Sequence, residues 1–197
     1  IALPDGSERH YSAPVTAAQI AADIGSGLAK AAIAAVVNGE NWDINRVINV
    51  DSEIRLITFK DDYSLELIRH DCAHILAEAV LELFPETQVT IGPAIETGFY
   101  YDFYRKSPFS TDDLATIEQR MHEIVDRDEE ITRGEWSREE AIRFYKDRNE
   151  PFKIELVDAI PEKETVSYYQ QGNFIDLCRG PHMVSTKKVG HEFNLMK

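Results

Sequence analysis

The sequence has no apolar run long enough to cross a membrane, and it has no pattern typical of a secretory signal peptide. A membrane-spanning helix needs about 20 mostly apolar residues, and a signal peptide needs a basic start followed by an apolar stretch. Neither pattern occurs in these 197 residues. The sequence therefore gives no support for a membrane or secreted protein, and we expect a cytoplasmic location without a membrane partner.

Cysteine is also scarce, since the chain contains only Cys72 and Cys178. Both lie in short motifs that also contain histidine, which argues against a disulfide framework and favours a reducing compartment. Internal repeats and low-complexity tracts are absent from the sequence. A hydrophobic content of 43% and a charged content of 28% are ordinary for a globular protein. The length suits one or two domains with a real core.

Positive charge is in short supply, with 21 Lys and Arg against 35 Asp and Glu and a net charge of −14. Such an acidic balance disfavours a nucleic-acid partner. Much of the excess lies in the block 112–150, where arginines recur at helical spacing, as is typical of a solvated helical face. A nucleic acid would therefore contact only the side that carries the positive residues near the motifs described below. These residues are Lys60, Arg69, Arg105, Lys106, Arg179, Lys187 and Lys188.

Residues 1–60 show the pattern of a small unit of strands around one short helix. Thr16 and Gln19 form a capping box at the start of that helix, and we expect Gly25 and Gly27 to end it. The dipeptide Asn38-Gly39 is the strongest short signal for a hairpin. The expected strands include Ala31–Val37, Val47–Val50 and Ile54–Phe59. This order predicts a ubiquitin-like β-grasp domain, and because it contains no catalytic group we expect a binding or tethering module.

Residues 61–197 predict an α+β domain with an antiparallel sheet packed on helices. A long helix is expected from Asp61 to Phe84, where Pro85 stops it. Its expected core face comprises Leu65, Ile68, Cys72, Ile75, Leu76, Ala79, Val80 and Leu83. Further helices are expected at 112–127 and 137–149, the second of which opens with the capping box Ser137–Glu140. Strands are expected within 88–103 and at 152–157, 165–170 and 174–177.

Two pairs of side chains that lie far apart in the chain share one spacing, His70 with His74 and Cys178 with His182. On a helix, a separation of four residues puts both imidazoles on one face. In the second pair, the turn-forming Gly180-Pro181 can fold His182 back toward Cys178. Together the pairs supply three imidazoles and a thiol.

This set of side chains is open to two chemical interpretations. It has the ligand types and number of a tetrahedral zinc site. Alternatively, imidazoles that titrate near neutrality can activate water without a metal. Asp176 would share a strand face with Cys178, and its carboxylate could orient an imidazole as a proton acceptor.

Several of these residues also have ordinary structural interpretations. A histidine pair on one helix face more often packs and satisfies polar groups than forms a site. Cys72 points away from that pair and is expected in the core. Lys153, in the alternating run 152–157, has the pattern of a solvated strand lysine. Of Tyr100 and Tyr101, one is expected in the core and the other toward a pocket. The remaining histidines have no evident partner and are expected at the surface: His10, His122 and His191.

Over nearly its whole length the chain resembles the amino-terminal half of bacterial threonyl-tRNA synthetases. Residues 1–60 are similar to the TGS domain of that family, a β-grasp fold, through Leu3–Gly6, Leu28–Lys30 and Val37–Gly39. Residues 61–197 are similar to its editing domain. The motifs that carry this second resemblance are His70–His74, Ile91–Pro93, Gly98–Asp102 and Phe174–His182.

The resemblance implies that the second domain hydrolyses seryl-tRNA(Thr), which forms when the synthetic site attaches serine by mistake. Serine lacks only the methyl group of threonine, and one methyl in a pocket is worth about 1–3 kcal/mol, too little for accurate translation. A second pocket that accepts serine and rejects threonine supplies the missing discrimination. The full-length parent would use ATP to attach threonine to tRNA(Thr).

The resemblance also implies roles for individual residues. His70 would bind or activate the attacking water, and His74 and His182 would orient the substrate and relay protons. Lys153 would hold the water or the developing oxyanion. The remaining implied site residues are Asp176 and Cys178, which shape the site, and Tyr101, Gly92 and Arg179, which contact the substrate. The terminal adenosine of the tRNA would bind beside Tyr101 and the loop 178–182.

By the same resemblance we expect no metal and no other cofactor in this part of the protein. ATP, magnesium and zinc are expected only for a catalytic core that the sequence lacks, and dimerisation only through a part that is absent. Two alternatives stay open. One is a zinc-dependent hydrolase or a zinc-stabilised domain built on the same four side chains. The other is a non-catalytic tRNA-binding module in which the β-grasp unit does the binding.

Overall fold

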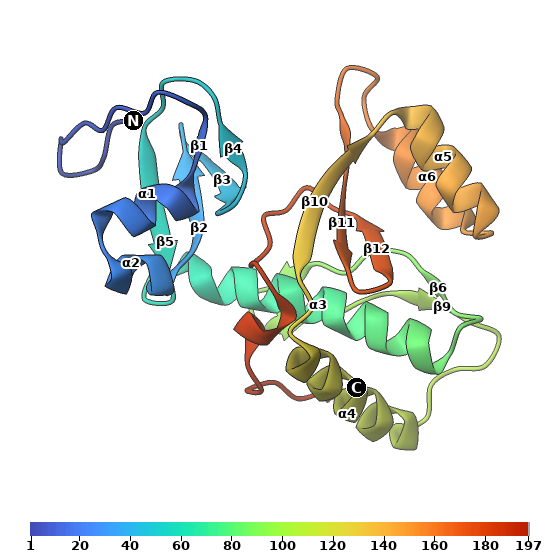
Figure 1. Cartoon of the computed structure of the whole chain (residues 1–197). Coiled ribbons are helices and arrows are strands. Elements are labelled where there is room, and N and C mark those ends of the chain that lie inside the picture. Colours follow the sequence, from blue (N-terminus) through green and yellow to red (C-terminus); the bar gives the residue numbers. More distant parts are fainter. Residues whose placement is uncertain (197) are drawn as a thin grey trace. The chain divides into compact units, whose positions relative to one another are not determined.

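The computed structural model describes residues 1–196 and shows a mixed α/β protein with antiparallel sheets, as predicted (Figure 1). It divides into two compact units. The first comprises Ile1–Ile68 together with the loop Gly180–Val184, and the second comprises Arg69–Arg179 and the stretch that starts at Ser185. The division falls inside the long helix, further along the chain than the boundary after residue 60 that we predicted. Within residues 1–196, no helix combines the length and apolar character that a membrane span requires.

The first unit packs two short helices against a three-stranded antiparallel sheet of order β3-β2-β5. Its strands are β1 (Val15–Thr16), β2 (Ala32–Val37), β3 (Glu40–Asp43), β4 (Val47–Ile48) and β5 (Ile54–Thr58), and its helices are α1 (Ala17–Ile24) and α2 (Ser26–Ala31). Strands β1 and β4 form a separate antiparallel pair. Ile20 of α1 shares one buried cluster with Val37 of β2 and Ile54 of β5.

Local signals explain most of this unit. The Thr16 hydroxyl accepts from the Gln19 N–H at 3.2 Å, and the Gln19 side chain accepts from the Thr16 N–H at 2.9 Å, so the predicted capping box is confirmed. Asn38 and Gly39 have φ of 50° and 87°, the left-handed backbone that a two-residue hairpin requires. Gly25 ends α1 as predicted. The same prediction for Gly27 is wrong, because Gly27 lies inside α2.

Helix α3 (Tyr63–Leu83) is the long helix predicted from the sequence. Every residue from 71 to 80 is buried, so packing surrounds the middle of this helix and is not confined to one stripe. The prediction that Leu65 belongs to the core is wrong, since it is 50% exposed, whereas Leu67 is buried. Cys72 is buried as predicted, and burial raises the pKa of its thiol to about 12.

The largest sheet of the second unit has the order β10-β11-β12 and is antiparallel throughout. Its strands are β10 (Ile131–Trp136), β11 (Val166–Gln171) and β12 (Phe174–Leu177). We predicted β11 and β12 but not β10, which lies inside the charged block. Gly134 of β10 faces Tyr168 of β11, and a Cβ atom at Gly134 would be only 2.2 Å from that ring. The glycine that weakens the strand signal in the sequence is therefore what makes room for the cross-strand tyrosine.

Four further helical segments complete the second unit: α4 (Thr111–Arg127), α5 (Arg138–Asp147), α6 (Pro151–Ala159) and the 3₁₀ turn η1 (Thr186–Val189). Two small strand pairs join them, β6 (Gln88–Val89) with β9 (Phe103–Tyr104) and β7 (Ala94–Ile95) with β8 (Gly98–Phe99). Ser137 caps α5 through the predicted capping box.

The strand predicted at residues 152–157 is wrong, because this segment is helix α6. Pro151 occupies the start of the helix, a position where its missing N–H costs nothing. Lys153 and Val157 are the buried residues of α6 and lie four apart, which is a helical period. The apparent alternation in the sequence therefore did not reflect the pattern of burial.

Candidate active site

Helix α3 presents His70 and His74 one turn apart. Their ring centroids are 5.2 Å apart, and the rings meet edge to face at 84°. His74 is buried and also packs edge-on against Phe174 at the start of β12. The prediction that both imidazoles share one face of a helix is confirmed.

Cys178 follows the last residue of β12 and meets His70. Its Sγ lies 3.2 Å from His70 Nε2. Two contacts with Ser167 of β11 fix its backbone, since the Cys178 N–H donates to the Ser167 carbonyl at 3.2 Å and the Ser167 hydroxyl donates to the Cys178 carbonyl at 2.6 Å. The sheet therefore holds the thiol in place against the imidazole of the helix.

Within the second unit, the metal-ligating atoms of His70, His74 and Cys178 all lie within 4.8 Å of one another. His182, the remaining residue of the predicted set, belongs to the first unit. It lies in the loop Gly180–Val184, its side chain is buried, and its backbone N–H donates to the Asp43 carboxylate at 2.9 Å. Its part in the chemistry stays a prediction. Nitrogen and sulfur donors in this number suit zinc, and a neutral imidazole beside a thiol also suits proton transfer.

A buried ion pair lies at the base of β12. Lys153 Nζ is 2.5 Å from Asp176 Oδ1, 2.6 Å from the Thr90 carbonyl and 3.1 Å from the Tyr101 hydroxyl. The Tyr101 hydroxyl in turn donates to Asp176 Oδ2. Lys153 is 1% exposed and Asp176 is 2% exposed. A charged pair this deep is stable only when its remaining donors and acceptors are satisfied, and here the three ammonium hydrogens have three acceptors.

These contacts change what Lys153 and Asp176 can do. Lys153 could hold a water molecule or an oxyanion only by giving up one of its three acceptors, and in the present arrangement it holds Asp176 and Tyr101. The expectation that Asp176 orients an imidazole is wrong. Its carboxylate accepts from Lys153, from Tyr101 and from the N–H of Leu177 at 2.8 Å. Strand β12 ends at Leu177, so the alternation of a strand does not put Cys178 on the same face as Asp176.

Tyr101 lies between this ion pair and an apolar cavity. Burial and the neighbouring Asp176 charge raise the pKa of Tyr101 well above its usual value, so it stays a neutral donor. As predicted, one tyrosine of the pair is buried, since Tyr101 is 7% exposed and Tyr100 is 40% exposed. The ring of Tyr101 lines a cavity of about 590 Å³ whose other walls include Leu76, Val80, Phe99, Tyr100, Phe103, Phe109, Ile117 and Leu195.

The last two predicted contact residues differ in their surroundings. Gly92 lies directly against Tyr101, and a Cβ atom there would be 2.1 Å from the tyrosine ring. Arg179 has a side chain that is 84% exposed and pairs with Glu164 at 3.2 Å, a surface contact of small energy. The structure therefore gives Gly92 a packing function, while substrate contact by either residue stays a prediction.

Two features of the second unit were missed in the sequence. Thr90 supplies a backbone carbonyl to Lys153, and no sequence signal marks a carbonyl contact of this kind. His122 and His191 were expected at the surface without partners; His191 is exposed as expected, but both histidines have partners, so the second part of the prediction is wrong. Their Nδ1 atoms are 3.0 Å apart, and His191 Nε2 is 3.1 Å from Asp126. Because 69 residues separate the two histidines, their spacing gave no sign that they meet.

Comparison with known families agrees with both units. Residues 1–58 match the TGS domain, and residues 166–197 match the threonyl and alanyl tRNA synthetase second additional domain. The matched TGS segment confirms the β-grasp prediction for the first unit.

Individual relatives cover the whole chain. It is 55% identical over 197 residues to a threonine--tRNA ligase of Granulibacter bethesdensis and 57% identical over 198 residues to one of Paramagnetospirillum magneticum. A threonine--tRNA ligase of Rickettsia bellii is 54% identical over 197 residues. In each case the alignment covers 100% of this chain and 31% of the relative. The chain thus spans about a third of the length of these relatives. We conclude that it carries a TGS domain followed by a tRNA synthetase second additional domain and is similar throughout to the N-terminal region of bacterial threonine--tRNA ligases.

Proposed function

We propose that the second unit hydrolyses the ester that joins serine to tRNA(Thr). The observation that carries this proposal is the meeting of His70 with Cys178, next to the buried Lys153 pair, in a chain that is similar to the editing region of tRNA synthetases. Imidazole is the side chain best suited to take a proton from water near neutral pH. The substrate would be the 3′ end of tRNA(Thr) carrying serine.

In this proposal His70 is the general base for the attacking water. His74 and His182 orient the ester and relay protons. Cys178 confines one side of the His70 ring, because its thiol lies against Nε2. Lys153 and Asp176 keep Tyr101 in place at the edge of the site, and the terminal adenosine would enter the aromatic-lined cavity on the other side of that ring. Gly92 and Arg179 would add substrate contacts.

Selectivity would come from exclusion of the threonyl methyl. A synthetic pocket that fits threonine cannot strongly reject serine, because the missing methyl is worth only about 1–3 kcal/mol. A hydrolytic pocket too small for that methyl reverses the preference. The longer protein would be a threonine--tRNA ligase that uses ATP and works as a dimer through other regions. The present chain would deacylate without metal and would not aminoacylate.

The direct test compares deacylation of Ser-tRNA(Thr) and Thr-tRNA(Thr) by the wild type, His70→Ala and His10→Ala. General-base assistance contributes about 10²–10⁴-fold, so we expect a loss of that size for His70→Ala with seryl-tRNA. His10 of the first unit serves as the matched control and should behave as the wild type. A loss below about tenfold at His70 removes it from the role of base, and a folded wild type inert toward both substrates contradicts the proposal.

The ligand set favours one second candidate, a zinc site. His70, His74 and Cys178 lie close enough together to converge on one ion, and zinc binds such nitrogen and sulfur donors. Elemental analysis of protein purified without chelator separates the two candidates. Stoichiometric zinc that is lost in Cys178→Ser would replace the metal-free proposal. A non-catalytic tRNA-binding module would instead show tRNA binding that survives His70→Ala, with no hydrolysis by the wild type.

A further inference from the structure

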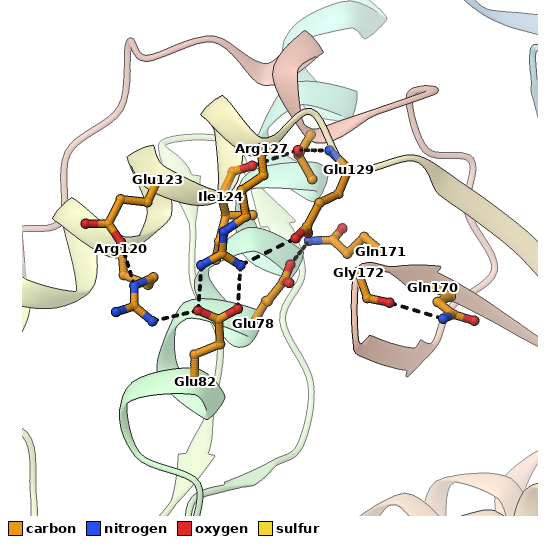
Figure 2. A network of polar contacts seen from close by, with 11 residues as sticks. Glu78, Glu82, Arg120, Glu123, Ile124, Arg127, Glu129, Gln170, Gln171 and Gly172 are labelled. Carbon is orange, nitrogen blue, oxygen red and sulfur yellow. Dashed lines mark hydrogen bonds and ion pairs between the residues drawn. The ribbon is translucent and has the colours of Figure 1, made fainter.

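A second polar cluster lies on α3, one turn beyond His74 (Figure 2). Glu78 is only 3% exposed, and its Oε2 accepts from Gln171 Nε2 at 2.7 Å. Gln171 ends β11, and the next residue, Gly172, packs against the Glu129 carboxyl so closely that a Cβ atom there would be 2.8 Å from it. The cluster therefore joins three segments of the second unit: α3, the β11–β12 hairpin and the connection from α4 to β10.

This cluster contains more hydrogen-bond acceptors than donors. Glu129 Oε2 and Gln171 Oε1 are buried and have no donor. Arg127 reaches Glu129 Oε1 only at 3.4 Å, because its guanidinium is bound to Glu82 at 2.5 and 2.9 Å. Buried acceptors without a donor are unfavourable. One proton on the carboxyl pair formed by Glu78 and Glu129 would supply a missing donor.

The electrostatic surroundings favour such a proton. Burial raises the pKa of Glu78 to about 8; the hydrogen bond from Gln171 opposes this shift, while the Glu129 carboxyl and the Glu82 charge add to it. The groups that face Glu78 are thus Gln171 from β11, Glu129 from the α4–β10 connection and Glu82 from α3 itself. The nearest positive groups are Arg120 and Arg127 of α4, and both are bound to Glu82 (Figure 2).

We propose that the Glu78 carboxyl keeps its proton at neutral pH and donates it to the Glu129 carboxylate, and that this hydrogen bond positions α3 against the β11–β12 hairpin. Helix α3 carries His70 and His74, and the hairpin carries Asp176 and leads into Cys178. The pair therefore sets the distance across which the His70–Cys178 contact forms. Without the proton, the buried Glu78 carboxylate faces the partly buried Glu129 carboxylate, and the segments move apart. Glu78 and Glu129 are positioning residues, and only the activity part of this proposal rests on the proposed deacylation.

The direction of the pH effect follows from proton binding. Because the pKa of Glu78 is higher in the folded than in the unfolded chain, the folded protein binds more protons between the two values. The free energy of unfolding therefore falls as pH rises toward about 8. This contribution is fully present below the unfolded pKa, is lost progressively as pH rises, and is gone above about pH 8.

Thermal unfolding of the chain, measured from about pH 6 to about pH 9.5, tests without any substrate whether the Glu78 carboxyl is protonated. In Glu78→Gln the amide is neutral at every pH and can donate to Glu129. We expect the melting temperature of the wild type to fall from about pH 6 to about pH 8 and to level off above that, and that of Glu78→Gln to stay nearly level throughout. Glu129→Gln removes the facing carboxylate but leaves Glu78 buried, so it should reduce the slope without levelling it. Glu66→Gln, the matched control at an exposed position in the first turn of α3, should retain the slope of the wild type. Equal slopes in the wild type and Glu78→Gln overturn the proposal.

Infrared spectroscopy and deacylation complete the test. A protonated carboxyl band should be present at neutral pH in the wild type and in Glu66→Gln, and absent in Glu78→Gln. If the wild type deacylates Ser-tRNA(Thr), its rate above the blank should fall in the alkaline range and that of Glu78→Gln should not. If it does not deacylate, unfolding and infrared still decide the matter. Stability that depends on added Mg²⁺ together with no such band would mean that a cation, and no proton, fills the cluster, which overturns the proposal.

Discussion

Gly92 supports the site because its lack of a side chain leaves room for the Tyr101 ring. The Tyr101 ring occupies the space that a Cβ atom at residue 92 would need, and the hydroxyl of that ring completes the contacts of Asp176 and Lys153. We expect Gly92→Ala to displace the ring, to destabilise the protein by about 1–3 kcal/mol and to reduce deacylation. Denaturant unfolding measures the first effect and turnover of Ser-tRNA(Thr) the second.

Gly27 offers the matched control for this substitution. It lies in α2, and a Cβ atom there would meet nothing within 4 Å. Gly27→Ala should therefore leave the protein unchanged or stabilise it by up to about 1 kcal/mol, because alanine favours helix. If Gly92→Ala and Gly27→Ala changed the free energy of unfolding equally, the close approach of Gly92 to Tyr101 would contribute nothing to stability.

The Lys153–Asp176 pair gives a second prediction at the scale of single residues. Removing one partner of a buried pair leaves an uncompensated charge and typically costs about 3–5 kcal/mol, whereas replacing both is often close to neutral. We therefore expect Lys153→Met to be strongly destabilised and Lys153→Met/Asp176→Asn to regain much of that loss in a double-mutant cycle. If Lys153 acted only on substrate, Lys153→Met would unfold like the wild type.

At the same scale, the sequence indicated which residue types matter but not their partners. The shared spacing pointed to His70, His74 and Cys178, and the structure brings them together. The Lys153–Asp176 bond joins α6 to β12, and no spacing signals a pair formed between separate elements. We assigned Asp176 to the imidazoles because Cys178 and His182 follow it closely in the sequence. Burial determined its actual partner, since Lys153 is the charge it meets inside the protein.

At the scale of elements, local chemistry predicted the helices that begin with a cap and the hairpin that turns at Asn38-Gly39. Local chemistry gave wrong predictions where tertiary packing determines the secondary structure. The α6 segment alternates in hydrophobicity, yet it is helical because Lys153 and Val157 must both point inward. Strand β10 carries charged residues and a glycine and was missed, since its pairing with β11 depends on room for Tyr168.

Helix α3 links these elements to the proposed chemistry. It is buried through its middle turns, and it carries the His70–His74 pair at one point and Glu78 one turn later. A change in the proton count at Glu78 therefore acts on the same rigid element as the proposed general base. Nothing in the sequence pattern distinguishes this glutamate from a solvated one, because Gln171, which binds it, and Glu129, which acts on it electrostatically, lie far away in the chain.

For the whole molecule, the net charge of −14 governs any encounter with tRNA. Binding to nucleic acid draws its affinity from phosphate contacts by Lys and Arg and weakens with salt roughly in proportion to their number. We expect this chain alone to bind tRNA(Thr) weakly, with a shallow salt dependence. The second unit offers Lys187 and Lys188 on η1 as phosphate contacts. Filter binding at two salt concentrations measures the slope.

Neutralising those two lysines should reduce both the affinity and the salt slope. The double substitution Lys187→Gln/Lys188→Gln removes two potential phosphate contacts, so the slope should fall by up to about two. Lys30→Gln, in the last turn of α2, is the control and should leave the slope unchanged. Hydrolysis under saturating substrate should also stay unchanged in the double variant, because neither lysine contacts the His70 group. An undiminished slope would show that the tRNA is bound by other residues and that η1 does not face the phosphates.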